Sequence, residues 1–473
     1  MEDDHEELLQ YSDEDSVSET DDPCCPIDKC QDRVLYPLTF FPHTKLDFFV
    51  TLVSLILSTL TLLIVLPLYV SSINVRGNIY SLFAFNITLS TCILAVILVV
   101  VHYTFHMSRN RPLLQFPVNI WKLIHLAGVY VISIYLYLYG SDRNRVLCHL
   151  QDPIKGIVLV IALLYYFFFC RNLMGLHRIF STTTVIVGLF IAVDYGLCDE
   201  FVCRGYDRQQ IVDDAGPWSW KIHSIWTGLY IFSLILFASL YTLLDRYVAP
   251  NYDQMMPCAS FLSPTFLNTI SRSVVNEGTS TNAIEDESQE NNDRRDTSNG
   301  VPMQKSPVSF AFWIHFFVLL WAILTFWIDF LHGFGKADSV AENLNFTLKG
   351  LQCHFFHDGQ SSPHCNNVVW YALIFQMAYV IFWISSVRLL ILSQSAVFTI
   401  AAMSYALPVV GIWWSLFYAS PSGVLVWAPK IRGEFVCSII GCPIVSVGLG
   451  LLCKTHFEDI RKPRNLIGRP LRS

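Results

Sequence analysis

Residues 313–332 read WIHFFVLLWAILTFWIDFLH, a stretch that is long and apolar enough to cross a membrane as a helix. About 20 such residues span the roughly 30 Å of hydrocarbon in a bilayer. The stretch nevertheless contains His315, Asp329 and His332. A charged side chain at the centre of a bilayer costs roughly 2.5 kcal/mol or more, so titratable groups placed there are functional candidates.

The spacing of these three groups favours a shared helix face. In a continuous helix, His315 and Asp329 are roughly 21 Å apart along the axis and within about 40° of the same face. His332 follows Asp329 at a spacing that allows contact. Such a titratable stripe predicts a proton relay. The alternative is that both ends of the stretch lie near the membrane interface, where His and Asp side chains reach water.

The composition extends the membrane interpretation to the whole chain. Of its 473 residues, 53% are hydrophobic and only 15% are charged, which predicts an all-α, polytopic membrane protein. Between Met1 and Asp22 there are eleven Asp and Glu residues and no Lys or Arg. We expect this tail to be disordered and cytosolic, and not a cleavable signal peptide.

Ten apolar segments are long enough to span a membrane. They divide into six helices within residues 47–247 and four within 309–453, separated by a polar cytosolic loop at 248–308. An acidic tail at 1–46 and a basic tail at 454–473 flank them. The expected spans are 47–70, 79–104, 117–139, 152–170, 176–194, 221–247, 309–334, 368–390, 393–418 and 430–453.

Loop charges and a glycosylation sequon predict the orientation. The loops HMSRNRP and RNLMGLHR and the tail RKPRNLIGRPLRS are basic, and the positive-inside rule places them, with both termini, in the cytosol. The opposite side then contains Asn345 in an Asn-Phe-Thr sequon, an expected glycosylation site. It also contains two cysteine pairs that could form disulfides there: Cys198 with Cys203, and Cys353 with Cys365.

Several further polar residues lie within the spans. His125 and Gln376 are deep enough that hydrogen bonds between helices are their expected role. Lys122, His223 and Arg388 lie close enough to span boundaries to be interfacial anchors.

The loop CHFFHDGQSSPHC, residues 353–365, combines two Cys with His354, His357 and His364. These residue types suit zinc, or a cluster that senses acid because His titrates near pH 6.5. A disulfide accompanied by exposed His is the simpler interpretation. We assign no metal and keep the three histidines as candidate acid sensors.

At the amino terminus, DHEELL places Asp4 before Leu8 and Leu9. This matches the acidic dileucine pattern that sorting adaptors read on proteins bound for endosomes and lysosomes, although acidic tails also produce it by chance. The protein is therefore expected in the plasma membrane or an endolysosomal membrane.

Motifs for catalysis are missing from the sequence. There is no glycine-rich phosphate loop, GxSxG, HExxH or paired CxxC, so we expect neither an enzyme nor a cofactor. No basic patch with interleaved aromatic residues indicates nucleic-acid binding. The expected partners are the lipid bilayer, protons or a small solute, a sorting adaptor and, for a homo-oligomer, further copies of the chain.

The region from Trp121 to Asp194 resembles the otopetrin proton channels. Its matching features are the Cys148-His149 entry with Pro153, the exit from Tyr165 to Phe169, and a Thr-containing fifth span. GLYIFSLILFASLYTLLDRYV, residues 228–248, resembles the sixth span of that family. LCKTHFEDI, residues 452–460, resembles its terminal pattern, with Lys454, His456 and Glu458 in the matching places.

This resemblance implies a proton channel of twelve spans in two six-helix halves, with His456 at the cytosolic mouth. The chain departs from it in having four spans after the polar loop. The pore Gln and Glu of the family are replaced by Leu163 and Ile231, and Thr182 to Thr184 stand in place of its Asn. Conduction would then use other groups or be lost.

The last two spans resemble the drug/metabolite transporter superfamily, including the chloroquine-resistance-type transporters of acidic vacuoles. They read FTIAAMSYALPVVGIWWSLFY at 398–418 and GEFVCSIIGCPIVSVGLGLL at 433–452, with small residues that allow close packing. This resemblance implies two inverted five-span repeats, with His125 and Gln376 facing a midplane cavity. The loop from Gly140 to Asp152 is long where that fold usually turns tightly.

We therefore predict an ion channel that conducts protons and responds to acid, with a drug/metabolite-type carrier of a small solute as the alternative. In the channel, His315, Asp329 and His332 would be stations along the path. Two structural criteria separate the functions. Symmetry relating spans 1–5 to spans 6–10 favours the carrier, and a break after span 6 into two separately packed bundles favours the channel.

Overall fold

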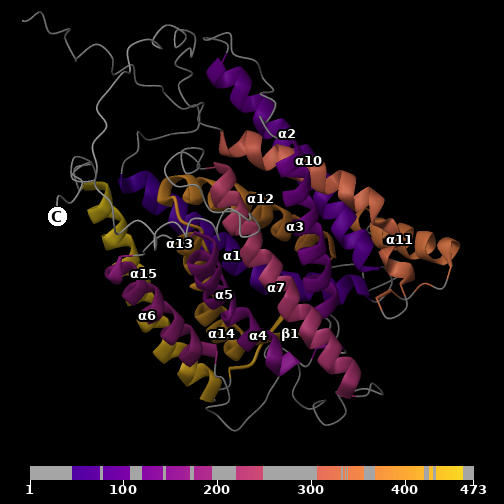
Figure 1. Ribbon diagram of the computed structural model, residues 1–473. Coiled ribbons are helices and arrows are strands. Elements are labelled where there is room, and N and C mark those ends of the chain that lie inside the picture. The colour runs from indigo at the N-terminus through magenta and orange to yellow at the C-terminus, as the bar shows by residue number, and fades with distance from the viewer. Residues whose placement is uncertain are drawn as a thin grey trace, which may run out of the picture. The chain divides into compact units, whose positions relative to one another are not determined.

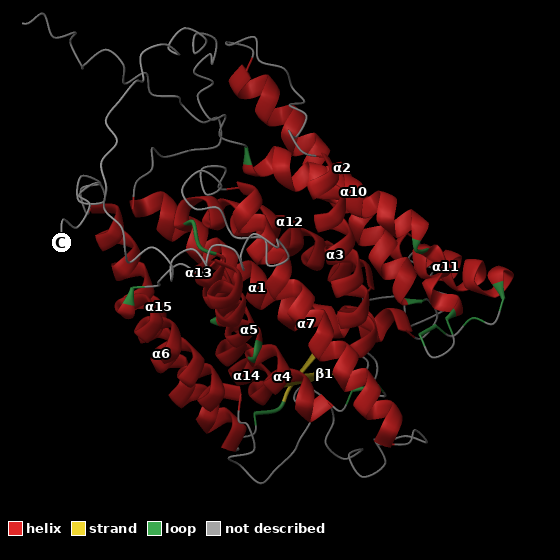
Figure 2. Cartoon of the chain, in the orientation of Figure 1, coloured by secondary structure: helices red, strands yellow, loops and turns green. Residues whose placement is uncertain are grey.

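The computed structural model describes residues 45–74, 78–106, 120–141, 145–146, 148–170, 175–193, 220–248, 306–331, 334–335, 337, 339–355, 368–419, 425–429 and 433–461. Within these ranges, ten helices are long and apolar enough to cross a membrane, and they confirm the all-α, polytopic fold (Figure 2). Residues 37–473 form one compact unit.

We number the ten spans in chain order. Spans 1, 2 and 3 are α1 (Lys45–Asn74), α2 (Ile79–His106) and α3 (Ile120–Gly140); span 4 combines α4 (Cys148–Gly156), α5 (Val158–Tyr165) and the π-helical turn η2 (Tyr166–Cys170); spans 5 and 6 are α6 (Leu176–Val193) and α7 (Trp220–Val248). Span 7 combines α10 (Pro307–Leu324) and the 3-10 helix η4 (Phe326–Phe330); span 8 is α12 (Val368–Ser393); span 9 combines α13 (Ala396–Ser404) and α14 (Ala406–Leu416); span 10 is α15 (Gly433–Arg461).

Two spans break near proline. Pro153 lies inside α4, and Pro408 follows the break between α13 and α14. Proline has no N–H to donate and its ring crowds the carbonyl four residues earlier, which explains the break before Pro408. The break in span 4, at Ile157, comes one turn after Pro153. In span 7 the break is at Thr325, whose hydroxyl donates to the Trp321 carbonyl at 2.8 Å. Hydroxyl groups that bond back to the preceding turn commonly bend helices.

Two elements lie outside the ten spans. The helix α11 (Val340–Phe355) occupies the loop that precedes span 8, and a two-stranded antiparallel hairpin, β1 (Phe417–Ala419) with β2 (Leu425–Trp427), links spans 9 and 10. The sequence predicted neither element. Span 10 also continues to Arg461, so the first residues of the expected basic tail, including His456, are helical.

The most extensive contact between two helices is that of α6 with α15, which lie side by side in Figure 1. Glycine makes this approach possible. A Cβ atom on Gly441 would lie 2.5 Å from the Cβ of Ala192 and 2.6 Å from the carbonyl oxygen of Gly188. Small residues allow helices in membranes to pack backbone to backbone in this way.

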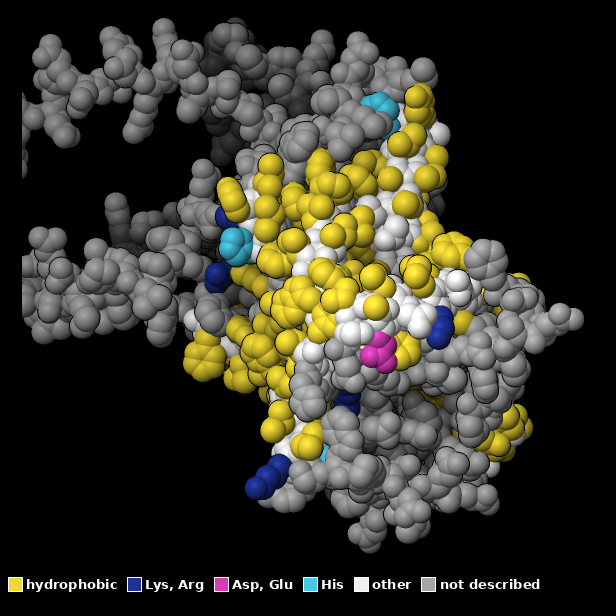
Figure 3. Space-filling view, turned by 90° about the vertical axis from the view of Figure 1, so that its right-hand side faces the viewer, with side chains coloured by type: hydrophobic (Ala, Val, Ile, Leu, Met, Phe, Trp, Pro, Cys, Tyr) yellow, Lys and Arg dark blue, Asp and Glu magenta, His cyan; other side chains and the backbone are white. Residues whose placement is uncertain are grey.

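The outer surface of the bundle is largely apolar. Figure 3 shows one face on which hydrophobic side chains dominate and charged side chains are few. Exposed aliphatic and aromatic residues occur along the described spans, among them Leu57, Val96, Phe190, Ile323 and Met377. A large exposed apolar surface of this kind is what a bilayer would cover.

Candidate functional site

The interior of the bundle contains polar side chains at three levels. We call the end at which α1 begins the first end and the end at which α1 stops the second end. Between them lies the middle layer, which consists of Ser90 of α2, Tyr130 of α3, His315 of α10, and Gln376, Tyr379 and Trp383 of α12.

His315 is the titratable group of the middle layer, and only 1% of it is exposed. Its Nδ1 lies 2.7 Å from the Ala311 carbonyl oxygen. A carbonyl only accepts hydrogen bonds, so Nδ1 carries the proton and the Nε2 of a neutral ring is left as an acceptor. That Nε2 has no hydrogen-bond partner among the described residues.

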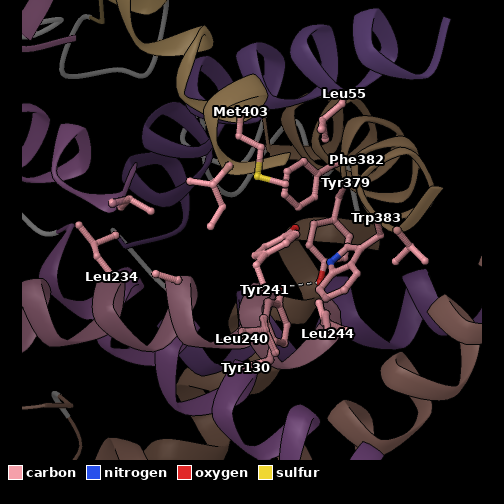
Figure 4. Close-up of a cluster of buried hydrophobic side chains, with 14 of the residues drawn as sticks. Leu55, Tyr130, Leu234, Leu240, Tyr241, Leu244, Tyr379, Phe382, Trp383 and Met403 are labelled. Carbon is pink, nitrogen blue, oxygen red and sulfur yellow. Dashed lines mark hydrogen bonds between the residues drawn. The ribbon is translucent and has the colours of Figure 1, made fainter. Parts of the chain in front are cut away.

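Aromatic rings surround this histidine. The ring centroid of His315 lies 5.5 Å from that of Tyr379 and 5.1 Å from that of Trp383, both in edge-on arrangements. The hydroxyl of Tyr379 is 2.6 Å from that of Tyr130, and Tyr241 of α7 lies beside this pair (Figure 4). The layer is closed by ring contacts in this conformation.

Gln376 is also 1% exposed, and its neighbours fix its orientation. The hydroxyl of Ser90 donates to the Asn86 carbonyl at 2.6 Å, which uses its only hydrogen. The amide nitrogen of Gln376 must therefore donate to the Ser90 oxygen, at 2.7 Å. This leaves Oε1 of Gln376 as a second buried acceptor with no partner in the described part of the chain.

The same hydrogen bonds continue toward α11. The amide nitrogen of Asn86 donates to the Leu82 carbonyl and to the Tyr69 hydroxyl, at 2.7 and 3.1 Å, so Oδ1 of Asn86 is a third buried acceptor without a described partner. Tyr69 in turn lies 2.5 Å from Nε2 of His354, whose Nδ1 is bonded to the Gly350 carbonyl.

His354 joins α11 to the bundle. Its ring stacks on Phe85 with a centroid distance of 4.0 Å, and 6% of the residue is exposed. Burial lowers the pKa of His354 to about 4, against the opposing effect of the hydrogen bond to the Gly350 carbonyl. The neutral ring is therefore the form that fits this contact with Tyr69.

The second end holds a buried cluster around Arg145, which is 7% exposed. Its guanidinium donates to the Phe334 carbonyl and lies over the rings of Tyr139 and Trp226, at 5.0 and 4.5 Å. The hydroxyl of Tyr139 donates to Asp329, of which 2% is exposed. The cluster thus joins α3, α7 and η4 across the end of the bundle.

Two further contacts complete this end. Nδ1 of His223, at the start of α7, lies 2.9 Å from the Arg145 carbonyl oxygen. Gly335 packs against the backbone of Asp329 so closely that a Cβ atom would lie 1.7 Å from the Asp329 carbonyl oxygen. Glycine is required there because any side chain would collide with that carbonyl group.

The first end is closed by an ion pair. Arg388 of α12 donates to Asp47 of α1 at 2.6 Å, and their side chains are 18% and 5% exposed. Nearby, Asp245 of α7 accepts the backbone N–H of Ala396 at 3.3 Å. His456 is buried at this end, stacked on Phe48 with a centroid distance of 5.1 Å. A small pocket here is lined by Arg178, Thr182, Ser393, Ser395, Val397, Phe398, Leu452 and His456.

The structure separates the residues of the expected stripe. His315 lies in the middle layer, whereas Asp329 lies in η4 at the second end, because the α-helix stops at Leu324. The shared face assumed one continuous α-helix, and the helix between His315 and Asp329 is not a continuous α-helix. Gln376 is buried as expected, but His125 is exposed on α3, so the two do not face one interior. His332 lies outside the described residues.

Arg388 and His223, which were expected to be interfacial anchors, lie at the two ends of the bundle, where Arg388 pairs with Asp47 and His223 contacts the Arg145 carbonyl. Cys353 is disulfide-bonded, and Asn345 is exposed on α11. The remaining predicted residues lie outside the described residues: His357, His364, Cys365, Cys198, Cys203, Asp4, Leu8 and Leu9.

Sequence reasoning missed the pairing of Asp47 with Arg388 and the cluster of Tyr139, Arg145 and Trp226. Arg145 falls in a short polar loop and Asp47 at the start of a span, so neither interrupts an apolar run. The sequence signal for this pair was an acidic residue at the start of one span, Asp47, and a basic residue near the end of another, Arg388. In the described part of the chain, no group of three or more His, Cys, Asp or Glu residues could hold a metal ion.

Comparison with known proteins adds no family to this description. No family model matches the chain, and no curated protein matches it in sequence.

Proposed function

We propose that this multi-pass membrane protein is a secondary carrier built from two inverted repeats of five spans, spans 1–5 (residues 45–193) and spans 6–10 (residues 220–461). The observation that carries the proposal is the pattern of packed helices. Such repeats are typical of carriers that bind a solute near the bilayer midplane and open alternately to either side.

The test of the pattern is to exchange each span n with span n + 5. Spans 1 and 8 pack extensively, and the exchange turns this pair into spans 6 and 3, which also pack extensively. In the same way, the pair of spans 4 and 6 becomes spans 9 and 1, and the pair 3 and 7 becomes 8 and 2. The pair 9 and 10 becomes 4 and 5. In each case both the original pair and its counterpart are in contact. The contacts 5 with 10, 2 with 7 and 4 with 9 are their own counterparts.

The residues that close the two ends follow the same relation. At the first end, Asp47 at the start of span 1 meets Arg388 near the end of span 8. The counterparts are the start of span 6 and the end of span 3, where Nδ1 of His223 lies 2.9 Å from the carbonyl oxygen of Arg145, in the loop just after span 3. Because each repeat has an odd number of spans, span 6 starts at the opposite face of the membrane from span 1. The two contacts therefore lie at opposite faces.

The criterion that favours a two-bundle channel is not met in the described residues. Of the four most extensive contacts, spans 5 with 10, 1 with 8 and 2 with 7 join a helix before residues 249–305 to one after them, and the fourth joins spans 3 and 6. Six weaker contacts have no counterpart among the stronger contacts of the described residues: spans 1 with 2, 5 with 9, 6 with 8, 6 with 9, 7 with 8 and 8 with 9. A carrier with only one end open at a time is expected to depart from exact symmetry.

In this proposal the two ends are gates and the middle layer is the solute site. The expected orientation makes the first end cytosolic. Separating Asp47 from Arg388 opens the cytosolic gate, and separating Arg145 from His223 and Asp329 from Tyr139 opens the other. The proposed carrier acts in the plasma membrane or in an endolysosomal membrane. Its mechanism includes neither an enzyme activity nor a cofactor.

The experiment is a two-sided labelling assay on the full chain in sealed vesicles. Ser90→Cys, in a background in which the cysteines of the spans, including Cys92, Cys437, Cys442 and Cys453, are replaced by serine, is exposed to a membrane-impermeant thiol reagent from either side. A carrier allows labelling from both sides. Arg388→Gln should raise the rate from the cytosolic side and lower it from the other, and His223→Ala should do the opposite.

Labelling from one side alone in all variants, or a sustained current that follows the proton gradient, contradicts the proposal. Asn345→Gln, an exposed change on α11, is the control that should leave both rates unchanged.

A further inference from the structure

The middle layer contains buried polar atoms that have no hydrogen-bond partner among the described residues. Nε1 of Trp383, a donor, lacks a partner in the described structure. So do three buried acceptors: Nε2 of His315 and Oε1 of Gln376 in this layer, and Oδ1 of Asn86, one turn before Ser90 in α2. Their orientation follows from bonds that their own donor groups make to carbonyl or hydroxyl oxygens. Most buried polar groups in proteins have a partner, so each exception requires an explanation.

Charge is the second property of the layer. The described contacts of His315, Gln376 and Tyr379 involve only neutral side chains and the backbone. Asp47, Asp245 and Arg388 lie toward the first end, and Arg145 and Asp329 lie at the second. A cation would thus be buried without a counter-charge, which is costly. An anion would likewise be buried without a counter-charge, and the acceptor atoms of His315 and Gln376 would repel it.

Ring surfaces are the third property. Tyr130, Tyr379 and Trp383 bring aromatic rings to the same level as the bare acceptors. When a gate opens and the rings part, these surfaces suit an apolar or planar body. The polar atoms then select for hydrogen-bond donors, because a donor-bearing solute satisfies acceptors that are otherwise left unpaired.

We infer that the transported solute is a neutral molecule with at least two O–H or N–H donors on an apolar or planar body, bound by His315 and Gln376 in the middle layer. This inference rests on the carrier proposed above and specifies its solute class. It excludes carboxylates and phosphates outright, and it ranks a neutral donor above an ammonium ion of the same size.

A stability measurement tests the inference without knowing the solute. A bare buried acceptor destabilises the empty protein, so an apolar replacement of similar shape removes that penalty. His315→Phe should raise the Tm of the full chain in nanodiscs by about 2 °C, and Gln376→Met should raise it less because its bond to Ser90 is lost. Thr182→Val is the matched control, since its buried hydroxyl already donates to the Arg178 carbonyl.

Three single-ring probes of similar size then test the class: resorcinol, which is a neutral double donor, benzoate and benzylammonium. We expect millimolar resorcinol to raise the Tm of the wild type and not that of His315→Phe, with benzoate having no effect. A lower Tm for His315→Phe, a benzoate shift equal to that of resorcinol, or a larger shift with benzylammonium overturns the inference.

Failure here is distinguishable from failure of the carrier itself. If Ser90→Cys is labelled from both sides and responds to the gate variants while resorcinol has no effect, the carrier stands and the solute class is wrong. If labelling is one-sided, the carrier fails whatever the probes do.

Discussion

The ends of the bundle hold charged side chains in ion pairs, hydrogen bonds and ring contacts, whereas the middle layer holds neutral polar groups. At the first end, Arg388 meets Asp47 at 2.6 Å, and at the second end Asp329 accepts from Tyr139 while Arg145 lies against two rings. In the middle layer, His315 and Gln376 each keep an acceptor bare. The difference indicates that the ends hold this conformation closed, while the middle layer is arranged for a donor from outside the chain.

The largest effect is expected at the first end. Arg388→Gln leaves Asp47 buried without its cation, and breaking a buried ion pair typically costs about 3–5 kcal/mol. Thermal unfolding in detergent should show this loss, and Asp47→Asn together with Arg388→Gln should recover part of it. Lys454→Gln is the control, because its pair with Glu458 is long, at 3.8 Å, and exposed. Equal effects of the two single changes would contradict the comparison.

Acid should loosen the link between α11 and the bundle. Burial lowers the pKa of His354 to about 4 from a usual value of 6.5, so between these values the unfolded chain binds a proton that the folded chain does not. Stability is therefore constant above pH 6.5 and falls as the pH drops toward 4, by about 3 kcal/mol at most. The Tm of His354→Phe should depend less on pH than that of the wild type.

The control for this titration is Asn345→Gln, an exposed change on the same helix that should keep the wild-type slope. A slope for His354→Phe as steep as that of the wild type would show that other groups cause the loss in acid.

The close approach of Gly441 to Ala192 involves packing alone, so a change there provides a reference for the stability lost at the polar contacts. Gly441→Ala inserts a methyl group 2.5 Å from the Cβ of Ala192 and must push α15 from α6. Overpacking of this kind typically costs about 2 kcal/mol. Gly450→Ala, in the same helix with no atom within 4 Å of the added carbon, is the matched control and should be tolerated. The unfolding temperature of Gly441→Ala should therefore be lower than that of Gly450→Ala.

The smallest effect is expected at the second end. Tyr139→Phe removes the hydroxyl that donates to Asp329 but keeps the ring beneath Arg145. A hydrogen bond to a charged group contributes about 1.5–3 kcal/mol, and the lower value applies if water replaces the hydroxyl when this end opens. The Tm should fall modestly relative to Tyr103→Phe, an exposed control. No fall would mean that this contact does not keep the second end closed.

Sequence reasoning located the ten spans because length and hydropathy alone determine where a helix can cross a bilayer. It identified His315 and Gln376 as candidates because polar residues in apolar runs are conspicuous. It did not predict that the α-helix ends at Thr325 before Asp329, because no periodicity marks that break. It missed the role of Asp47 because its partner, Arg388, is remote in sequence, and the paired helices α1 and α12 meet only in the folded chain.

The most direct test of the inverted repeats uses two pairs of spin labels that the symmetry relates. Leu46 and Leu176 lie at the starts of spans 1 and 5, and Ile222 and Val436 lie near the starts of spans 6 and 10; all four are exposed. Distances within each pair are measured in the otherwise unaltered chain and in Arg388→Gln. The account predicts that the variant lengthens the first distance and shortens the second. Two distances that stay constant, or that change in the same direction, would contradict it.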